Sequence, residues 1–419
     1  RHERMNQVRA DVMTARERLA ALGWIPGRSE YFHHLPPPGV QVWMGGEDGE
    51  PSLADPGAPE SAEAGWKLET LRSTQQGLVE AQWLDAADGV QRTQLFAGIA
   101  APGDGDADRF AWAHQAMCSR GLRLHIGSGA VPVGDRQGEA VWLALRRHAQ
   151  AALEAPMLVI DVLPGMRCVL LESHEHGGDT GAIVQNLDVH INLGDGASLQ
   201  HLRVATAGAN DRIAHRVHVR LGRDASYDQA LIASGSSYHL QRIELDLHGA
   251  HASARTGAAL FAAGAALEHQ VETLHGGACT TSAVEALVLA CGKARGVVNA
   301  YSRIAAGADE ASVRQRLCGI PTGGQPKLVL RPHLEINHDK VEAVHGATWG
   351  ALPEEALFYA RQRGLDESSA RALIIEGLLA AVLERSLGNP EVMQVLNLNT
   401  LLAGAVARYL AAGKELSHE

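Results

Sequence analysis

VHVRLGRDAS, residues 217–226, has counterparts before and after it in the chain: VHINLGDGAS from Val189, IELDLHGAHAS from Ile243 and VETLHGGAC from Val271. The leucines before the turns are Leu193, Leu221, Leu247 and Leu274, at spacings of 28, 26 and 27 residues. Each segment alternates apolar and polar residues, which is typical of a strand with one buried face. Glycine or aspartate then follows, and these residues tolerate the positive φ angles that turns require.

A strand that recurs about every 27 residues, with no helical pattern between copies, indicates a β-solenoid in which each coil stacks on the one before. IDVLPGMRC from Ile160 fits the repeat loosely, and further strands are predicted at 287–291, 296–304 and 311–319. The alternative is an antiparallel β-sandwich with regular hairpins. Because the turn sequence recurs together with the strand pattern, we predict a mainly β protein with a solenoid core at 151–351.

The flanking regions are predicted to be largely helical. Residues 1–150 form an α+β/helical region with helices at 5–22, 108–120 and 139–153, an acidic linker at about 45–65 and a strand at 122–126. Residues 352–419 form a helical domain. There, Pro353 and Asn389-Pro390 start helices, Gly364 ends one and Asp366 caps the next.

Composition restricts the function. The formal net charge is −11 and no Lys/Arg-rich run offsets it, which argues against a general nucleic-acid-binding role. The five cysteines include no CxxC pair, and an odd, widely spaced set is typical of a reducing compartment. The longest apolar stretch, 257–267, is too short to cross a bilayer, and the sequence shows no secretory signal. We therefore expect a cytoplasmic protein that does not enter the membrane.

RPHLEINHDKVEAVHGATWG, residues 331–350, is predicted to be the last strand pair, with a turn at 338–340, and EEALFYARQRGL follows from Glu354. This order resembles the SufB/SufD family of iron–sulfur cluster assembly proteins, and its SufD members more than its SufB members. The resemblance is strong over about 155–385 and loose over the first 150 residues. It is carried by Pro332, Leu334, Glu335, Ile336, Asp339, Val341, His345, Gly346, Ala347, Thr348, Gly350, Phe358, Tyr359, Arg363, Gly364 and Ala370.

The resemblance implies a right-handed parallel β-helix flanked by helical regions. It also implies a non-catalytic scaffold subunit that pairs with SufB through a β-helix junction near His345 and contacts the ATPase SufC through its C-terminal helices. A transient iron–sulfur cluster would be shared with SufB, with none stably bound by the isolated chain, for which a homodimer is an open alternative. The chain itself contains no GxxxxGK[ST] phosphate-binding motif.

The same resemblance assigns roles to individual residues. His345 takes the place of a family histidine at the junction, and a neutral imidazole is a suitable iron ligand. Many relatives have Cys-Ser before this His-Gly, whereas this chain has Ala343 and Val344, so no thiolate is present there. Cys318 is a secondary candidate for a redox or cluster role only because it is the cysteine nearest the signature, and the resemblance itself assigns it no role. Phe358, Tyr359 and Arg363 are implied to contact the ATPase, and Pro332, Glu335, Gly346 and Thr348 belong to the signature.

Structural interpretations stand beside these roles. His345 can be a structural histidine, and Phe358, Tyr359 and Arg363 can simply pack and cap a helix. We expect His333 and His338 at the surface, and small buried roles for the cysteines. Histidines on or near the repeat strands are expected on solvated faces: His190, His201, His215 and His218.

Two rival functions belong to other classes. One is a carbohydrate-active β-helix enzyme, which needs paired carboxylates and aromatic sugar platforms, although aromatic residues make up only 4% of the chain. The other is a metal-dependent β-fold enzyme that uses His174, His176 and a distant third histidine, where His174 and His176 share a strand face if that segment is a strand. That enzyme would hold stoichiometric metal in the isolated chain, whereas the scaffold would hold little or none.

Overall fold

The computed structural model describes residues 2–46, 65–72, 77–127, 140–175 and 181–418. Its strands in chain order are β1 (Trp66–Thr70), β2 (Val79–Asp85), β3 (Arg120–Ile126), β4 (Ala140–His148), β5 (Leu153–Glu154), β6 (Met157–Val162), β7 (Arg167–Glu175), β8 (Val184–Leu193), β9 (Ser198–Ala205), β10 (Arg212–Leu221), β11 (Ser226–Ser234), β12 (Tyr238–Leu247), β13 (Ser253–Ala263), β14 (Ala266–His275), β15 (Thr281–Gly292), β16 (Arg295–Ile304), β17 (Ala311–Gly324), β18 (Lys327–Ile336) and β19 (Val341–Trp349). The helices are α1 (His2–Leu22), α2 (Val40–Met44), α3 (Gly89–Leu95), α4 (Asp108–Met117), α5 (Glu354–Gln362), α6 (Glu367–Leu387), α7 (Pro390–Val395) and α8 (Leu398–Ser417).

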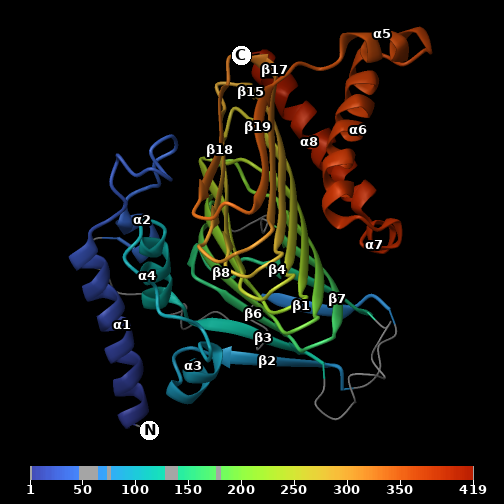
Figure 1. Cartoon of the computed structure of the whole chain (residues 1–419). Coiled ribbons are helices and arrows are strands. Elements are labelled where there is room, and N and C mark those ends of the chain that lie inside the picture. The colour runs from blue at the N-terminus through green and yellow to red at the C-terminus, as the bar shows by residue number, and fades with distance from the viewer. Residues whose placement is uncertain (1, 47–64, 73–76, 128–139, 176–180, 419) are drawn as a thin grey trace.

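The core is a parallel β-solenoid with helices at both ends of the chain (Figure 1). From β6 onward, successive strands alternate between two facing sheets. Sheet A has the order β1-β4-β7-β9-β11-β13-β15-β17-β19, and sheet B has the order β18-β16-β14-β12-β10-β8-β6-β3-β2, with β5 also paired to β8. From β6 onward the neighbouring strands of each sheet run parallel. The predicted solenoid is therefore confirmed, and the antiparallel sandwich is wrong.

The turn between the two sheets repeats from coil to coil and explains the recurring turn sequence. One residue in each turn has a left-handed backbone conformation, with φ between 56° and 73°. Its N–H donates to a carbonyl in the turn of the next coil at 2.7–3.0 Å, so the turns stack as the strands do. These residues are Gly165, Gly196, Asp224, His251, Cys279 and Glu310. Glycine and aspartate adopt this conformation at low cost, but the stacked hydrogen bonds also hold other residue types in it.

The repeat alignment predicted from the leucines is correct for three coils and off by one residue at the fourth. Leu193 pairs with Leu221, and Leu221 pairs with Leu247. Leu247, however, pairs with His275 rather than with Leu274. His275 occupies the buried position because Thr280 and Ser282 contact its ring nitrogens at 2.9 Å and 2.7 Å.

The predicted helix at 139–153 is wrong, because residues 140–148 form β4 and β5 begins at residue 153. Val141, Leu143 and Leu145 of β4 face the solenoid interior, while Trp142 and Ala144 pack on its other side. A strand buried on both faces is apolar throughout, and this pattern can be confused with that of a buried helix. Pairing of β1 with β4 and of β3 with β6 extends both sheets into residues 66–148. The domain boundaries at 1–150, 151–351 and 352–419 stay predictions.

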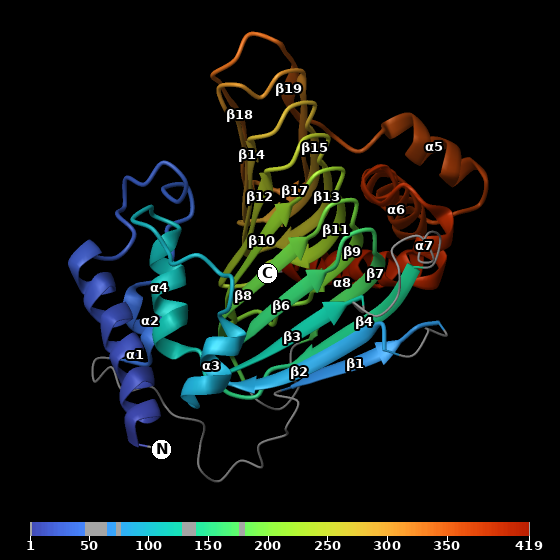
Figure 2. The same ribbon diagram turned by 60° about the horizontal axis from the view of Figure 1, so that its bottom comes forward.

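The terminal helices cover opposite outer faces of the solenoid (Figures 1 and 2). Phe32, Trp43 and Phe110 from the N-terminal region pack on Tyr238 and Leu240 of sheet B. Helices α6, α7 and α8 bury an apolar face against sheet A. The expected helix at 5–22 is confirmed by α1, and of the acidic segment at 45–65 only residues 45, 46 and 65 lie within the described residues.

The C-terminal helices begin and end as the sequence predicts. Pro353 is the residue before α5, and Gly364 has φ +89° after it. Asp366 accepts from the Ser369 N–H, and Asn389 caps α7. Within the described residues, no helix has the length and apolar character needed to cross a membrane.

Candidate functional site

The solenoid ends at two strands that carry the sequence signature. In the described chain, β18 pairs only with β16, and β19 pairs only with β17. Each strand therefore has one edge whose backbone groups are free to pair with another chain. The sequence placed this last strand pair and its turn correctly.

His345 lies in the middle of β19, opposite Gln315 of β17. It shares a strand face with Ala343 and Ala347, which pack against buried clusters of the solenoid. Its side chain is nevertheless exposed, because the described chain places no further strand above it. The imidazole is therefore available at the open end of the solenoid interior.

The other candidate ligand, Cys318, does not join His345. Cys318 lies on β17 opposite Thr348 and packs against the apolar cluster beneath the C-terminal helices. Gln315 is the partner of His345 in the sheet, and Cys318 lies three residues beyond Gln315 on the same strand. Because side chains alternate between the two faces of a strand, Cys318 points to the face opposite that of Gln315 and His345. The structure thus brings no thiol of the described chain to His345.

The remaining signature residues lie around this end. Pro332 pairs with Ala300, and Glu335 accepts a hydrogen bond of 2.6 Å from the Tyr301 hydroxyl. A Cβ added at Gly346 would meet no atom within 4 Å, so packing within this chain does not require glycine there. Apolar side chains are also exposed nearby: Val344 is 58% and Trp349 is 59% accessible.

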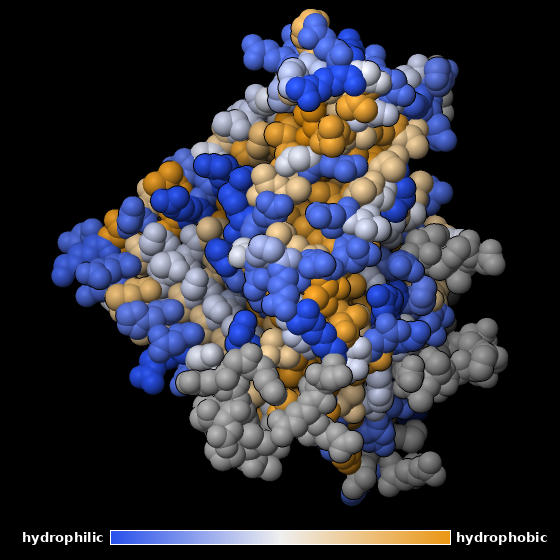
Figure 3. Space-filling model, turned by 90° about the vertical axis from the view of Figure 1, so that its right-hand side faces the viewer, coloured by the Kyte–Doolittle hydropathy of each residue, from blue (hydrophilic) through white to orange (hydrophobic). Residues whose placement is uncertain are grey.

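A second exposed apolar surface lies on the C-terminal helices. Phe358 is 63% accessible, and Tyr359 of α5 and Leu373 of α6 are also exposed. The Arg363 guanidinium lies 4.6 Å from the centre of the Tyr359 ring and donates to its hydroxyl. Helix α5 extends away from the solenoid in Figure 1. Figure 3 views the molecule from the right-hand side of Figure 1 and shows a group of apolar residues near the top of that face. These residues therefore form a surface rather than a core.

The expected solvated positions of His201 and His215 are wrong, because both are fully buried inside the solenoid. His201 Nε2 lies 2.9 Å from Glu172, and His215 Nε2 lies 2.5 Å from Gln185. Arg203 donates to both oxygens of Glu172, at 3.1 and 3.0 Å. Hydrogen bonding along the stacked strands thus satisfies polar groups in the interior, which alternation alone does not reveal.

Burial and the contacts around Glu172 shift the pKa values of Glu172, His174 and His201. Burial would raise the pKa of Glu172, but Arg203 and the hydrogen bonds from His174 and His201 hold it well below its ordinary value. Burial lowers the pKa of His174 and of His201, although Glu172 opposes that shift. His174 is therefore a buried partner of a carboxylate, and His176 lies outside the described residues.

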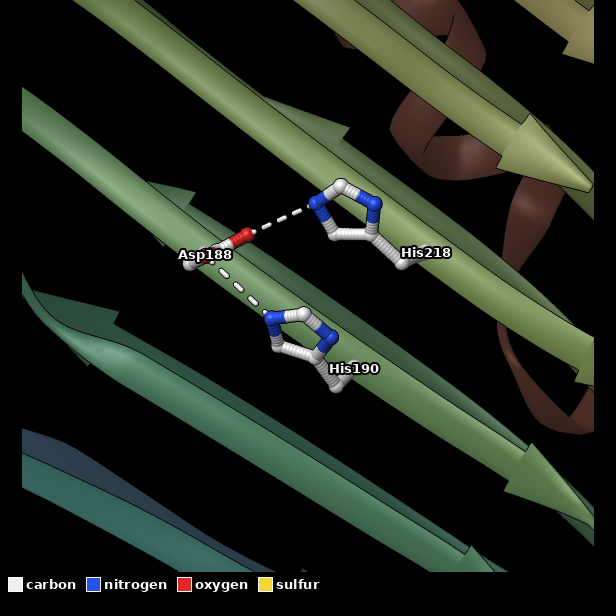
Figure 4. Close-up of side chains that lie close together, drawn as sticks. All are labelled: Asp188, His190 and His218. Atoms are coloured by element: carbon white, nitrogen blue, oxygen red, sulfur yellow. Dashed lines mark hydrogen bonds and ion pairs between the residues drawn. The ribbon is translucent and has the colours of Figure 1, made fainter. Parts of the chain in front are cut away.

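His190 and His218 lie on the outer face of sheet B, directly opposite each other in register. Their Nε2 atoms both approach the carboxylate of Asp188, at 3.2 and 3.0 Å (Figure 4). These three residues are the one group of three or more potential metal ligands found among the described residues. Asp188 is buried, whereas His190 and His218 are partly exposed, so the two histidines are neither core nor fully solvated.

A protein-family model described as the SufBD core domain of the SUF system for FeS cluster assembly matches residues 145–378. That is more than half of the chain. The chain belongs to the SufBD family. The matched residues run from β4 to α6 and include the solenoid end with His345 and the exposed helix α5. The resemblance found in the signature is therefore confirmed.

Two curated proteins are similar to this chain. The iron–sulfur cluster assembly protein SufD of Escherichia coli (strain K12) is 25% identical over 271 residues, which cover 63% of this chain and 58% of that protein. A Synechocystis sp. protein described as an iron–sulfur cluster assembly SufBD family protein is 38% identical over 55 residues, or 13% of this chain and 12% of that protein. The match to the E. coli protein thus spans somewhat more than half of its length.

Proposed function

We propose that this chain is a non-catalytic scaffold subunit of the SUF iron–sulfur assembly machinery, which pairs with SufB and with the ATPase SufC. The observation that carries the proposal is the open solenoid end, where His345 is exposed between unpaired strand edges. Family membership supports the assembly role. The five cysteines are free, as a reducing compartment such as the cytoplasm would require.

The partner at the solenoid end is proposed to be SufB. An exposed strand edge is a ready template for pairing with another chain. The edges of β18 and β19 lie beside Val344 and Trp349, whose apolar side chains gain from removal from water. A second solenoid that continued both sheets would bury these edges and side chains together.

The cluster is cargo at this junction rather than a resident group. A single imidazole does not hold an iron–sulfur cluster, and Cys318 points to the other face of the sheet. The remaining ligands would come from the partner, and a partner thiolate suits iron. Ligands divided between two chains would release the cluster when the chains move, which suits an intermediate that must be transferred.

The contact with SufC is proposed to involve Phe358, Tyr359 and Arg363. Aromatic residues and arginine are enriched where protein partners bind. An exposed aromatic side chain on a helix that projects from the core is well placed for such a contact. The ATP-dependent step would reside in SufC, since this chain has no P-loop motif.

The rival metal enzyme has less support. His174 is buried and hydrogen-bonded to Glu172. Its ring is therefore not exposed to solvent, as the ligand of an accessible metal site would be. The carbohydrate-active enzyme also has less support, because the open end of the solenoid exposes the apolar side chains of Val344 and Trp349.

The test is co-expression of the tagged full chain with SufB and SufC, followed by size-exclusion chromatography. Val344→Asp should abolish SufB association and keep SufC, while Phe358→Ala should weaken SufC association and keep SufB. Val90→Asp is the matched control, because Val90 is an exposed valine of α3, and it should keep both partners. Retention of SufB by Val344→Asp at the wild-type level would count against the junction.

A further inference from the structure

The outer face of sheet B carries a group of side chains that the proposed function does not use. Parallel register places His190 of β8 directly opposite His218 of β10. Asp188 lies two residues before His190, so it shares the same outward face. The two imidazole rings stack at 4.6 Å with an angle of 11° between their planes, and both present Nε2 to the Asp188 carboxylate (Figure 4).

The distances match the donor set of a metal site. His190 Nε2 lies 3.2 Å from Asp188 Oδ2, and His218 Nε2 lies 3.0 Å from Oδ1. The three ligand atoms all lie within 4.8 Å of one another. An ion bonded at about 2.0–2.2 Å to nitrogen and oxygen ligands fits between atoms at this spacing. Two imidazoles and one carboxylate are typical of Zn²⁺ and of non-haem Fe²⁺ rather than of Mg²⁺ or Ca²⁺.

His114 of α4 provides an independent observation. It is fully buried, and its Nε2 lies 2.9 Å from the Pro156 carbonyl oxygen. Nε2 must therefore carry the proton, which leaves Nδ1 with its lone pair. Nδ1 has no hydrogen-bond partner among the described residues and lies 3.9 Å from Asp188 Oδ2. A lone pair that faces a carboxylate is unfavourable unless a cation lies near both.

The surroundings supply the outer shell that metal sites need. His218 Nδ1 lies 2.8 Å from Glu244 Oε2. A ligating histidine commonly donates its other N–H to a carboxylate, which fixes the ring and increases its basicity. A cavity of about 680 Å³ lies beside the group and is lined by Asp188, His190, His218 and Glu244. An ion therefore has a route to the site.

The competing interpretation is an ion-pair cluster without metal. Arg216 lies 3.4 Å from Asp188 Oδ2. His218 also lies between two carboxylates, with Nε2 3.0 Å from Asp188 Oδ1 and Nδ1 2.8 Å from Glu244 Oε2. These contacts provide partners for Asp188 and His218, but they leave His114 Nδ1 without a hydrogen-bond partner among the described residues. An ion bound to Asp188 and facing Nδ1 would supply that partner.

We propose that Asp188, His190 and His218 bind one divalent first-row transition-metal ion, with His114 Nδ1 facing it. The site lies on the side of sheet B under α4, away from the open end with His345. The ion would be resident in the isolated chain, unlike a cluster shared with a partner. The metal content expected of the isolated scaffold therefore changes from little or none to one equivalent, and metal content alone no longer separates the scaffold from a metal enzyme. Bound there, it would link α4 of the N-terminal region to the solenoid.

The test is titration of the purified, chelator-treated full chain with Co²⁺, followed by visible absorption and calorimetry. Wild type should bind one equivalent and show the absorption bands of a histidine-ligated ion. His190→Asn should remove those bands. Glu244→Gln should weaken binding by about 10–100-fold, as expected for loss of an outer-shell carboxylate. This second variant touches no ligand atom directly, so it remains informative if His190→Asn folds poorly.

His345→Ala is the control that separates this site from the proposed function, and it should bind Co²⁺ as wild type does. Failure of wild type to bind a stoichiometric ion would overturn the proposal. So would wild-type affinity in a folded His190→Asn variant, or binding of Mg²⁺ in preference to Co²⁺. None of these results depends on cluster assembly.

Discussion

Glu172→Gln tests the account of the solenoid interior. Glu172 is fully buried and lies within hydrogen-bond distance of Arg203, His201 and His174. Glutamine keeps the shape but removes the negative charge, so the fully buried guanidinium of Arg203 loses its counter-ion. Breaking a buried ion pair by removing one partner costs about 3–5 kcal/mol, and we expect a loss of that size in the free energy of unfolding.

The assay is urea unfolding at pH 7, followed by tryptophan fluorescence. Trp66 is a suitable reporter because its ring packs against His174 at 5.5 Å. Adding Arg203→Met to Glu172→Gln should recover part of the loss, since no unpaired charge would remain. Glu69→Gln is the control, because Glu69 pairs with Arg146 at the surface, and it should leave the midpoint essentially unchanged. A loss below about 1 kcal/mol for Glu172→Gln, typical of an exposed pair, would refute the reasoning.

Two further predictions concern stability. Burial lowers the pKa of His239, His269 and His275 to about 4, whereas the unfolded chain binds these protons near pH 6.5. The free energy of unfolding should therefore fall as pH drops from about 6.5 toward 4, by about 1.4 kcal/mol per pH unit for each histidine. A urea midpoint that stays constant over this pH range would contradict the prediction. At Gly257, an added Cβ would lie 2.7 and 2.8 Å from atoms of α6, so Gly257→Val should cost about 1–3 kcal/mol by overpacking and lower the melting temperature. Gly377→Ala within α6 meets no atom and should stabilise by about 0.5–1 kcal/mol; equal melting temperatures for these two variants would argue against the close contact.

The repeat was readable from the sequence because each coil must bury the same inward positions. Spacings of 28 and 26 residues between the first three leucines correctly predicted that those leucines are neighbours in the sheet. The same spacing separates His190 from His218, so their proximity followed from the repeat. The repeat did not indicate a role for Asp188, because this carboxylate lies two residues before His190 and is brought to both histidines only by its position on the same strand face.

Other features depend on contacts that alternation does not encode. His201 and His215 are polar residues of predicted strands, for which a solvated position is the usual expectation, yet they point inward and contact Glu172 and Gln185. His114 is 74 residues before Asp188 in the sequence, and only the packing of α4 on sheet B brings them together. The strand at β4 was mistaken for a helix because it is apolar on both faces.

The most direct test of the central claim is the iron and acid-labile sulfide content of the complex with SufB and SufC, purified without oxygen, for wild type and His345→Ala. His333→Ala is the matched control, because His333 is an exposed histidine of the neighbouring end strand β18. The account predicts that the His345→Ala complex assembles but carries much less iron and sulfide, while His333→Ala loads normally. Normal loading of an intact His345→Ala complex would contradict the claim that the open solenoid end holds the nascent cluster.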